Sequence, residues 1–453
     1  MSRNTILIVA MTAWLADLVY TGGAFEAGLA VVVDERGAIM RLSRDAEDLK
    51  NAQRLAGRAI LPGLVNVHSH TFQRVIRGRT EHRTSASRDT FWTWRQSMYH
   101  AANAMSPDDI YRAARMAFLE MLLSGITAVG EFHYLHQDLE VARAILRAGE
   151  EVGLGVTLLR TAYVRAGWKK DPDPGQARFL TPDVDRYLAD TDEMIAGGAR
   201  VGVAPHSVRA VPLDYLRRVA EYARGRGLPL HMHVSEQPAE VEACVGEYGL
   251  RPVELLHENG ILGERFTAVH AIHITDEEAR FLGKSTVCAC PTSERNLGDG
   301  AVPADKLFDA GARICFGSDS NVQIDILEDA RELEYHLRMN RLERAVLAAD
   351  TSREGLARRL FESATESGAR SLVSPGGALE AGRAADFFTI DLNDCSVAGA
   401  DRESLLGHVV FSLERTAVRD VCVGGKLVVC DGRHRLQEEI VREFGEVQRN
   451  LWR

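Results

Sequence analysis

The stretch Leu61-Pro-Gly-Leu-Val-Asn-Val-His-Ser-His70 decides how this chain folds and what it can bind. An apolar run after a Pro-Gly turn is typical of a buried strand, and this one ends in two histidines. Side chains alternate across a strand, so His68 and His70 project from the same face. Two neutral imidazoles at one strand end can bind a single metal ion, although the pair alone also fits ordinary core or surface histidines.

Further segments have the same form, in which an apolar run ends abruptly in polar residues. Each segment alone fits an ordinary buried strand followed by a loop. Because a helix-like stretch separates one from the next, their repetition favours a sheet whose polar residues gather at one edge. The segments and their polar residues are 201–209 with His206 and Arg209, 228–236 with His231, His233 and Glu236, 266–273 with His270 and His273, and 311–319 with Asp319.

Composition excludes several classes of function. The 453 residues suffice for a full core and for more than one domain. The formal net charge of −10 argues against a nucleic-acid partner, whose phosphates require a basic face. No apolar run is long enough to span a membrane, so we expect no membrane partner.

The cysteines and the first residues bear on the compartment. The seven cysteines are scattered without a Cys-x-x-Cys pair, which suits a reducing cytosol better than a disulfide framework. The apolar run 5–14 has the length of a signal-peptide core, but a single arginine precedes it and no small-x-small cleavage site follows. We therefore interpret 5–14 as an opening strand and expect a cytoplasmic protein.

Two β-rich ends flank a long α/β centre. Short strands separated by turns are expected in 1–58 and again in 382–453. Within 418–430, a Gly-Gly turn joins two of these strands. We expect the two ends to form one small β-sandwich domain. The centre, 59–381, alternates strand and helix, which implies a parallel sheet.

The position of the polar residues chooses between two topologies for the centre. An open doubly wound sheet is one, but polar residues follow the strand C-termini throughout, as in a (β/α)8 TIM-like barrel with its active site on that face. The absence of a Gly-x-Gly-x-x-Gly or Walker loop leaves nucleotide-cofactor chemistry without support. After 61–70 we expect strands at 122–131, 154–161, 201–206, 229–234, 267–270, 286–290 and 313–318, with helices at 108–124, 214–226, 238–248 and 326–344.

Together these groups resemble the amidohydrolase superfamily. The likeness rests on the His-x-His pair, on the later histidines and on Ser318-Asp319 after the last predicted barrel strand. The run Gly382-Arg-Ala-Ala-Asp386 is also similar to that family's domain junction. Membership implies one or two divalent metals in the barrel. Binuclear members share a carboxylated lysine on a central strand, and none of the six lysines of this chain lies there. Because Glu236, three residues after His233, resembles the mononuclear deaminase branch, we expect one metal per subunit.

The resemblance also implies a set of ligands and a mechanism. One Zn²⁺ would be held by His68, His70, His233 and Asp319, and the same set also accepts Fe²⁺ or nickel. Water on such an ion has a pKa of about 7, against about 15.7 in bulk. Asp319 would accept the proton of that water, His270 would hydrogen-bond the developing oxyanion-like centre, and Glu236 would protonate the departing nitrogen. A carboxylate at a helix start on the surface is the alternative for Glu236.

Several loops narrow the likeness to the formimidoylglutamate deiminase family. This resemblance covers almost the whole barrel and implies hydrolysis of N-formimino-L-glutamate to N-formyl-L-glutamate and ammonia, in histidine degradation. The loops that carry it are 68–73, 91–95, 131–134, 206–209 and 293–299.

A small dicarboxylate substrate would need fixed cations, and the planar fork of arginine suits carboxylates. Arg209, in a strand-end loop, and Arg95, between aromatic residues, are the candidates. The resemblance implies that Gln73, Tyr134 and His206 also contact substrate. For Arg95 an exposed helix arginine is the alternative. Trp92 and Trp94 are expected to pack, and His133, His231 and His273 to be structural.

Three other hypotheses stay open. A deaminase of a guanine- or cytosine-like base would use the same metal chemistry but would need a neutral, stacking pocket. An imidazolone-ring hydrolase would cleave a C–N bond in the same pathway. A scaffold that has lost catalysis would have no reason to keep four ligands and Glu236. We also expect a homodimer.

Overall fold

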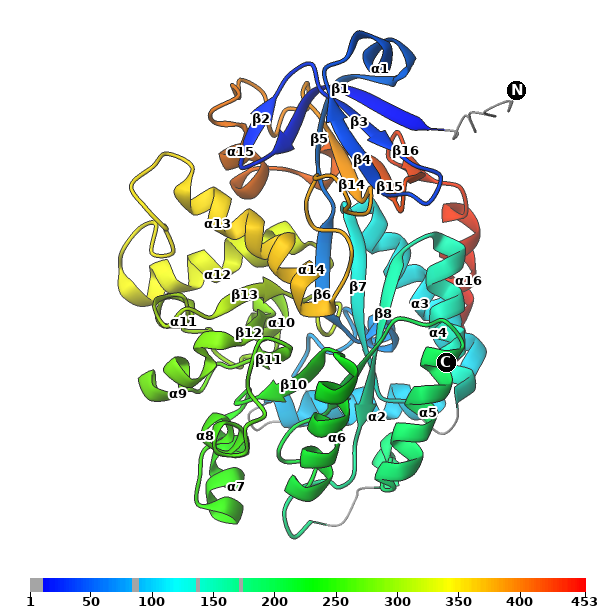
Figure 1. Ribbon diagram of the computed structural model, residues 1–453. Helices are drawn as coiled ribbons and strands as arrows, with labels where there is room; N and C mark the ends of the chain where they lie inside the picture. Colours follow the sequence, from blue (N-terminus) through cyan, green and yellow to red (C-terminus); the bar gives the residue numbers. More distant parts are fainter. Residues whose placement is uncertain (1–10, 84–88, 136–138, 171–173) are drawn as a thin grey trace, which may run out of the picture.

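The chain folds into a barrel with a β-rich domain at one end (Figure 1). The computed structural model describes residues 11–83, 89–135, 139–170 and 174–453. Residues 5–10 of the expected opening strand therefore lie outside the described residues. Within them, no helix combines the length and the apolar character that crossing a bilayer requires.

Eight parallel strands of the described chain form the expected (β/α)8 barrel, in the order β13 to β6. Buried, mostly apolar segments make these strands because helices cover the outer face of the barrel. The strands are β6 (Leu64–Ser69), β7 (Ile126–His133), β8 (Gly155–Ala162), β9 (Val201–Pro205), β10 (Leu230–Val234), β11 (Phe266–His270), β12 (Thr286–Ala289) and β13 (Arg313–Phe316).

The barrel closes where β6 meets the segment after β13. The Asp319 N–H donates to the His68 carbonyl, and the His70 N–H donates to the Asp319 carbonyl, both at 2.9 Å. Below them, the Asn66 amide donates to Ser318 Oγ at 2.7 Å. The first and last barrel strands are therefore joined at the site where the sequence places three metal ligands.

Helices surround the barrel, and their ends follow local sequence signals. The helix α3 (Pro107–Leu123) begins at a Ser106 cap that accepts from the Asp109 N–H. α6 (Leu213–Arg226) and α7 (Pro238–Tyr248) each end at a left-handed glycine. The others on the barrel are α2 (Phe91–Ala104), α4 (Leu139–Val152), α5 (Val184–Ala196), α8 (Pro252–Glu258), α9 (Asp276–Phe281), α10 (Pro291–Leu297), α11 (Ala304–Asp309), α12 (Ile326–Arg341), α13 (Gly355–Ala364) and α14 (Glu366–Leu372).

Two expected boundaries are wrong by several residues. The strand expected at 122–131 is β7, which begins at Ile126 because α3 continues to Leu123 and Gly125 turns the chain with φ +83°. The helix expected at 326–344 is α12, which ends at Arg341 because Leu342 adopts a left-handed φ of 57°. In both cases a single backbone reversal inside a continuous polar–apolar pattern sets the boundary.

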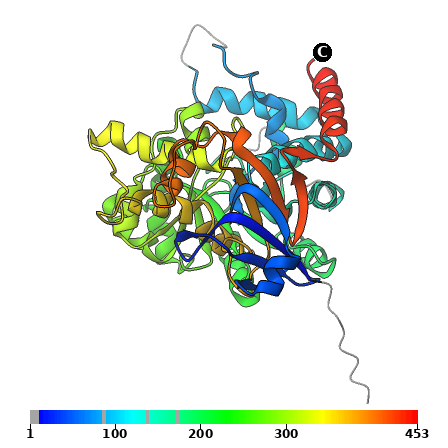
Figure 2. The ribbon, with the colours of Figure 1, turned by 90° about the horizontal axis from the view of Figure 1, so that it is seen from above.

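Both chain ends form the β domain, as expected, and their strands are hydrogen-bonded into one mixed sheet. The N-terminal and C-terminal strands lie side by side in the view from above (Figure 2), with β5 antiparallel to β14. The β domain has a hydrophobic core of its own, which includes Trp14, Val31 and Phe387. Its strands are β1 (Thr12–Thr21), β2 (Ala24–Glu26), β3 (Ala30–Val33), β4 (Ile39–Ser43), β5 (Gln53–Pro62), β14 (Phe387–Asp391), β15 (Val418–Val423), β16 (Lys426–Cys430) and β17 (Arg433–His434).

The connection between the two parts orients the barrel. Only Gly63 separates β5 in the mixed sheet from β6 in the barrel, so the barrel strands run away from the β domain and end on the opposite side (Figure 1). The Gly-Gly turn at 424–425 joins β15 to β16, as expected. The remaining helices are α1 (Ala46–Asn51), α15 (Leu405–Phe411) and α16 (Gln437–Leu451). The domain boundaries at 58 and 381 and the homodimer stay predictions.

Candidate active site

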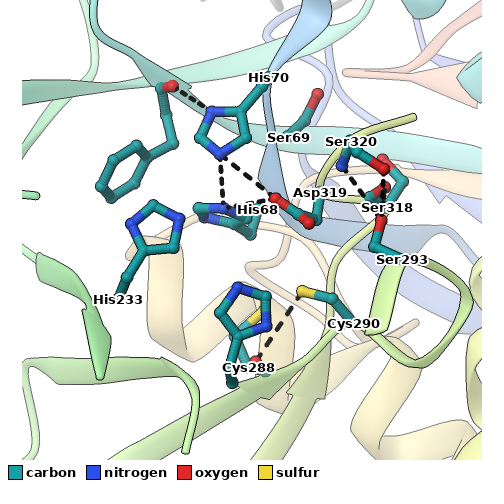
Figure 3. Close-up of polar contacts among 12 residues, drawn as sticks. His68, Ser69, His70, His233, Cys288, Cys290, Ser293, Ser318, Asp319 and Ser320 are labelled. Atoms are coloured by element: carbon teal, nitrogen blue, oxygen red, sulfur yellow. Dashed lines mark hydrogen bonds and ion pairs between the residues drawn. The ribbon is translucent and has the colours of Figure 1, made fainter. Parts of the chain in front are cut away.

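The four expected metal ligands lie together at the C-terminal end of the barrel. His68 is the last residue but one of β6, His70 follows that strand, His233 belongs to β10 and Asp319 follows β13. Each offers one ligand atom, and these atoms lie within 4.8 Å of one another, all buried. Figure 3 shows the three imidazoles pointing toward one another and toward the Asp319 carboxylate. His68 and Asp319 therefore share one site, although 251 positions separate them in the sequence.

Hydrogen bonds orient these imidazoles for metal binding. His70 Nδ1 lies 2.8 Å from the Phe132 carbonyl, and His233 Nδ1 lies 3.1 Å from the His206 carbonyl. Donation to a carbonyl places the proton on Nδ1 and leaves the Nε2 lone pair directed into the site. His70 Nε2 lies 3.1 Å from His68 Nε2 and 3.3 Å from Asp319 Oδ1.

The electrostatics of the cluster favour a divalent cation. Burial lowers the pKa of His68 to about 3 and that of His233 well below its usual range, so both imidazoles stay neutral. Burial alone would raise the pKa of Asp319, but His68 and His70, which donate to its carboxylate when their Nε2 atoms are protonated, hold that pKa well below its usual range. Three imidazole nitrogens and one carboxylate are a ligand set typical of zinc, and the residues present therefore fit such an ion.

The backbone around the cluster is strained. Among non-glycine residues of the described chain, Ser235, His270 and Asp319 adopt positive φ values of 52°, 72° and 42°. Left-handed φ costs about 1–3 kcal/mol at such residues and persists where the surrounding structure imposes it. All three follow or end barrel strands, so the strain turns polar side chains into the barrel mouth.

Glu236 and His270 lie beside the cluster, where the sequence places the proton-transfer groups. His270 Nε2 is 3.6 Å from Glu236 Oε1, and His270 Nδ1 is 3.1 Å from Glu294 Oε1. Burial disfavours the imidazolium, but Glu236 and Glu294 outweigh it and hold the pKa of His270 well above its usual range. Burial raises the pKa of Glu236, whose side chain is only 12% exposed. The surface alternative for Glu236 is therefore wrong.

A pocket opens directly from the cluster and contains all five expected substrate contacts. It offers about 470 Å³ of empty space, including its opening to solvent. Gln73 Nε2 donates to Tyr134 Oη at 2.8 Å. Arg95 is 7% exposed, so the alternative of an exposed helix arginine is wrong. The wall includes Gln73, Arg95, Tyr134, His206 and Arg209 together with Trp94, Tyr99 and Tyr163.

Some residues differ from their expected surroundings. Trp92 is 39% exposed rather than packed, whereas Trp94 lines the pocket. His133, His231 and His273 lie outside the ligand cluster and contact backbone carbonyls, of Leu135, Ser371 and Asp299 respectively.

Sequence reasoning missed Tyr163, Tyr99, Gln176 and Glu294. Tyr163 directly follows β8, so the rule that polar residues follow the strand ends would have found it. Glu294 lies in α10, which follows β12, and contacts His270. It belongs to the 293–299 segment that carries the family likeness, but the sequence alone indicates no role for it. Tyr99 and Gln176 belong to α2 and to the short helix η2 (Pro174–Phe179), and no local pattern indicates that these two segments meet.

Comparison with known proteins agrees with this geometry. The sequence model of the amidohydrolase family matches residues 59–428, and the chain belongs to that family. It is 38% identical to the formimidoylglutamate deiminase of Pseudomonas aeruginosa PAO1, over 91% of this chain and 93% of that protein. It is 30% identical to the 8-oxoguanine deaminase of the same organism, over 91% and 92%. The crystal structure of an amidohydrolase from Brucella melitensis superposes with a TM-score of 0.89 and 34% identity, covering 98% of this chain and 100% of that one.

Proposed function

We propose that this amidohydrolase hydrolyses N-formimino-L-glutamate to N-formyl-L-glutamate and ammonia. The observation that carries this proposal is the pair Arg95 and Arg209, which meet in the pocket beside the metal cluster. Within the described part of the chain neither guanidinium has a carboxylate oxygen within 4.0 Å, although ion pairs are frequent elsewhere. Unpaired arginines in a pocket favour an anionic ligand, and this substrate carries two carboxylates.

The ligand cluster would hold one Zn²⁺ through His68, His70, His233 and Asp319. When bound, this ion would lower the pKa of a water molecule and supply a nucleophile near neutral pH. Asp319 would accept the proton of that water. The water oxygen forms the new bond to the formimino carbon.

The remaining steps use Glu236 and His270. The imidazolium of His270, paired with Glu294, would hydrogen-bond the oxygen that becomes the formyl carbonyl. Glu236, which lies beside His270, would act as the general acid and carry a proton to the terminal nitrogen. The proton held by Asp319 would then pass to the same nitrogen, which leaves as ammonia as the C–N bond breaks. The hydroxyl proton would return to Glu236 as the C=O bond forms. The balance is one water consumed and one ammonia released.

Deamination of a heteroaromatic base is the second candidate, because relatives include an 8-oxoguanine deaminase over 91% of this chain. Such a base is uncharged or nearly so and would leave both pocket arginines without an anionic partner. Buried or half-buried cations without partners are costly. The dicarboxylate is therefore the better supported substrate.

Ammonia release from a panel of substrates tests the proposal. The zinc-loaded protein is incubated with N-formimino-L-glutamate, 8-oxoguanine, guanine, cytosine and an adenosine, and ammonia is measured. We expect turnover of the formimino acid alone. Turnover of a base without turnover of the formimino acid would overturn the proposal, and a His233→Ala protein serves as the inactive control.

A further inference from the structure

Tyr163 lies among the groups assigned to the substrate, although the proposed mechanism gives it no role. It directly follows β8, at the end of the barrel that holds the metal cluster, and is 1% exposed. Its ring packs edge-on against His206, with ring centres 4.8 Å apart at 76°. Its hydroxyl therefore faces the pocket from a rigid position.

Three hydrogen-bond donors surround the hydroxyl oxygen of Tyr163. Arg95 Nη2 lies 2.6 Å away, Gln176 Nε2 3.0 Å and Arg209 Nη1 3.4 Å. A phenol has one O–H to donate and two lone pairs, so these donors exceed what a neutral phenol oxygen can accept. Such convergence, with two cations included, is typical of a site for an anionic oxygen.

The groups that face Tyr163 determine its ionisation. Burial, with Arg209 and Arg95 nearby, lowers the pKa of His206 well below its usual range, so this imidazole stays neutral. Burial alone would raise the pKa of Tyr163, but Arg209 and Arg95 outweigh it and lower that pKa to about 8. The titratable or charged groups around the hydroxyl in the described structure are Arg95 and Tyr99 on α2 and His206 and Arg209 after β9.

We propose that Tyr163 controls carboxylate binding in this pocket, an inference that rests on the proposed function. As a phenol it donates its O–H to a substrate carboxylate held by Arg95 and Arg209. As a phenolate it takes both arginines as its own partners and excludes the carboxylate. Tyr163 is thus a specificity-determining and positioning residue, and dicarboxylate binding is linked to one proton.

The linkage has a definite size. Only protein with a protonated Tyr163 binds, so the apparent Kd is the intrinsic Kd divided by that fraction. Kd therefore rises about tenfold for each pH unit above the pKa, which is about 8. By reciprocity, a bound carboxylate raises the pKa of Tyr163.

Binding of two dicarboxylates tests this inference. The Kd of N-formyl-L-glutamate and of glutarate is measured by calorimetry on the zinc-loaded protein at several values from neutral to alkaline pH. We expect Kd to rise about 100-fold two units above the pKa in the wild type. Tyr163→Phe should bind with a nearly constant Kd. Tyr215→Phe, which removes a buried hydroxyl that donates to the Thr181 carbonyl, should keep the wild-type profile.

A second measurement follows the ionisation directly and does not depend on binding. The ultraviolet absorbance of tyrosinate is titrated in the wild type and in Tyr163→Phe. We expect one tyrosine to ionise near pH 8 in the wild type, to be absent from the variant and to shift upward when glutarate is bound. A wild type without this early tyrosinate, or a Kd profile unchanged by Tyr163→Phe, overturns the inference.

The outcome separates this inference from the proposed function. If the protein releases no ammonia from N-formimino-L-glutamate but glutarate binding depends on Tyr163 as stated, the function fails and the carboxylate site stands. If the protein is an active deiminase whose KM has the same pH profile in Tyr163→Phe, the inference alone fails.

Discussion

Arg209 gives the pocket much of its positive charge, from a half-buried loop position after β9. The substitution Arg209→Gln removes the charge-assisted hydrogen bond to the substrate carboxylate, which is worth about 1.5–3 kcal/mol. Because a carboxylate far from the reacting carbon is bound alike in ground and transition states, KM should rise about 10- to 150-fold with kcat almost unchanged. Steady-state kinetics measure this. Arg217→Gln, at an exposed helix position paired with Asp214, is the matched control.

Glu236 is expected to act on protons and not on the metal. Its carboxylate contacts His270 and is not one of the four clustered ligands. Glu236→Gln keeps the shape but removes the acid, so kcat should fall about 10²- to 10⁴-fold while zinc content stays at one per chain. His233→Ala should lose both zinc and activity. Zinc analysis together with steady-state kinetics distinguishes the two variants. Loss of zinc in Glu236→Gln would contradict the assignment of Glu236 to proton transfer.

At the scale of elements, Glu120 links the segment after His70 to the barrel wall. From α3 it accepts bonds from Arg74 Nη2 at 2.6 Å and Arg77 Nη1 at 2.8 Å, the former in η1 (Thr71–Ile76). Burial alone would raise the pKa of Glu120, but Arg77 and Arg74 outweigh it and lower that pKa below 4.5. Glu120→Gln breaks a buried ion pair and should lower the free energy of unfolding by about 3 kcal/mol.

The sign of the pH dependence follows from that lowered pKa. Glu120 contributes its full stabilisation above its unfolded value of 4.5, and this contribution is lost as pH falls through the folded pKa. The wild type and Glu120→Gln should therefore differ constantly near neutrality and converge in acid. Denaturant unfolding at several pH values measures this. A difference independent of pH below 4.5 would contradict it, and Glu446→Gln, at an exposed ion pair with Arg112, should change little.

How much the sequence predicts depends on the range of the signal. Strands, helices and the barrel follow from local periodicity and from polar residues at strand ends, and the structure confirms the fold. The set of four ligands comes from the resemblance to a family, and the structure brings these residues together. Gln176 meets Tyr163 only because η2 packs near α2, and Glu294 meets His270 only because α10 begins beside the end of β11. Such pairings depend on loop paths, which no periodicity encodes.

At the scale of the whole molecule, the cluster of metal ligands lies where the first barrel strand meets the segment after the last one. His68 belongs to the first barrel strand, Asp319 follows the last one, and the backbones of these two residues are hydrogen-bonded to each other. A Cβ at Gly317 would lie 2.7 Å from His68 Cβ, so the two strands approach as closely as glycine permits. An ion shared by both strands would therefore oppose opening of the barrel along this seam.

Removal of the metal should accordingly destabilise the entire fold and not only the site. An ion at about 100 times its Kd adds about 2.7 kcal/mol to the free energy of unfolding. The melting temperature of chelator-treated protein should rise with added zinc, in proportion to the logarithm of its concentration, and Asp319→Ala should show no such rise. His257→Gln, at an exposed histidine outside the cluster, should respond as the wild type does. If the melting temperature of the wild type does not change with added zinc, no ion joins the two strands.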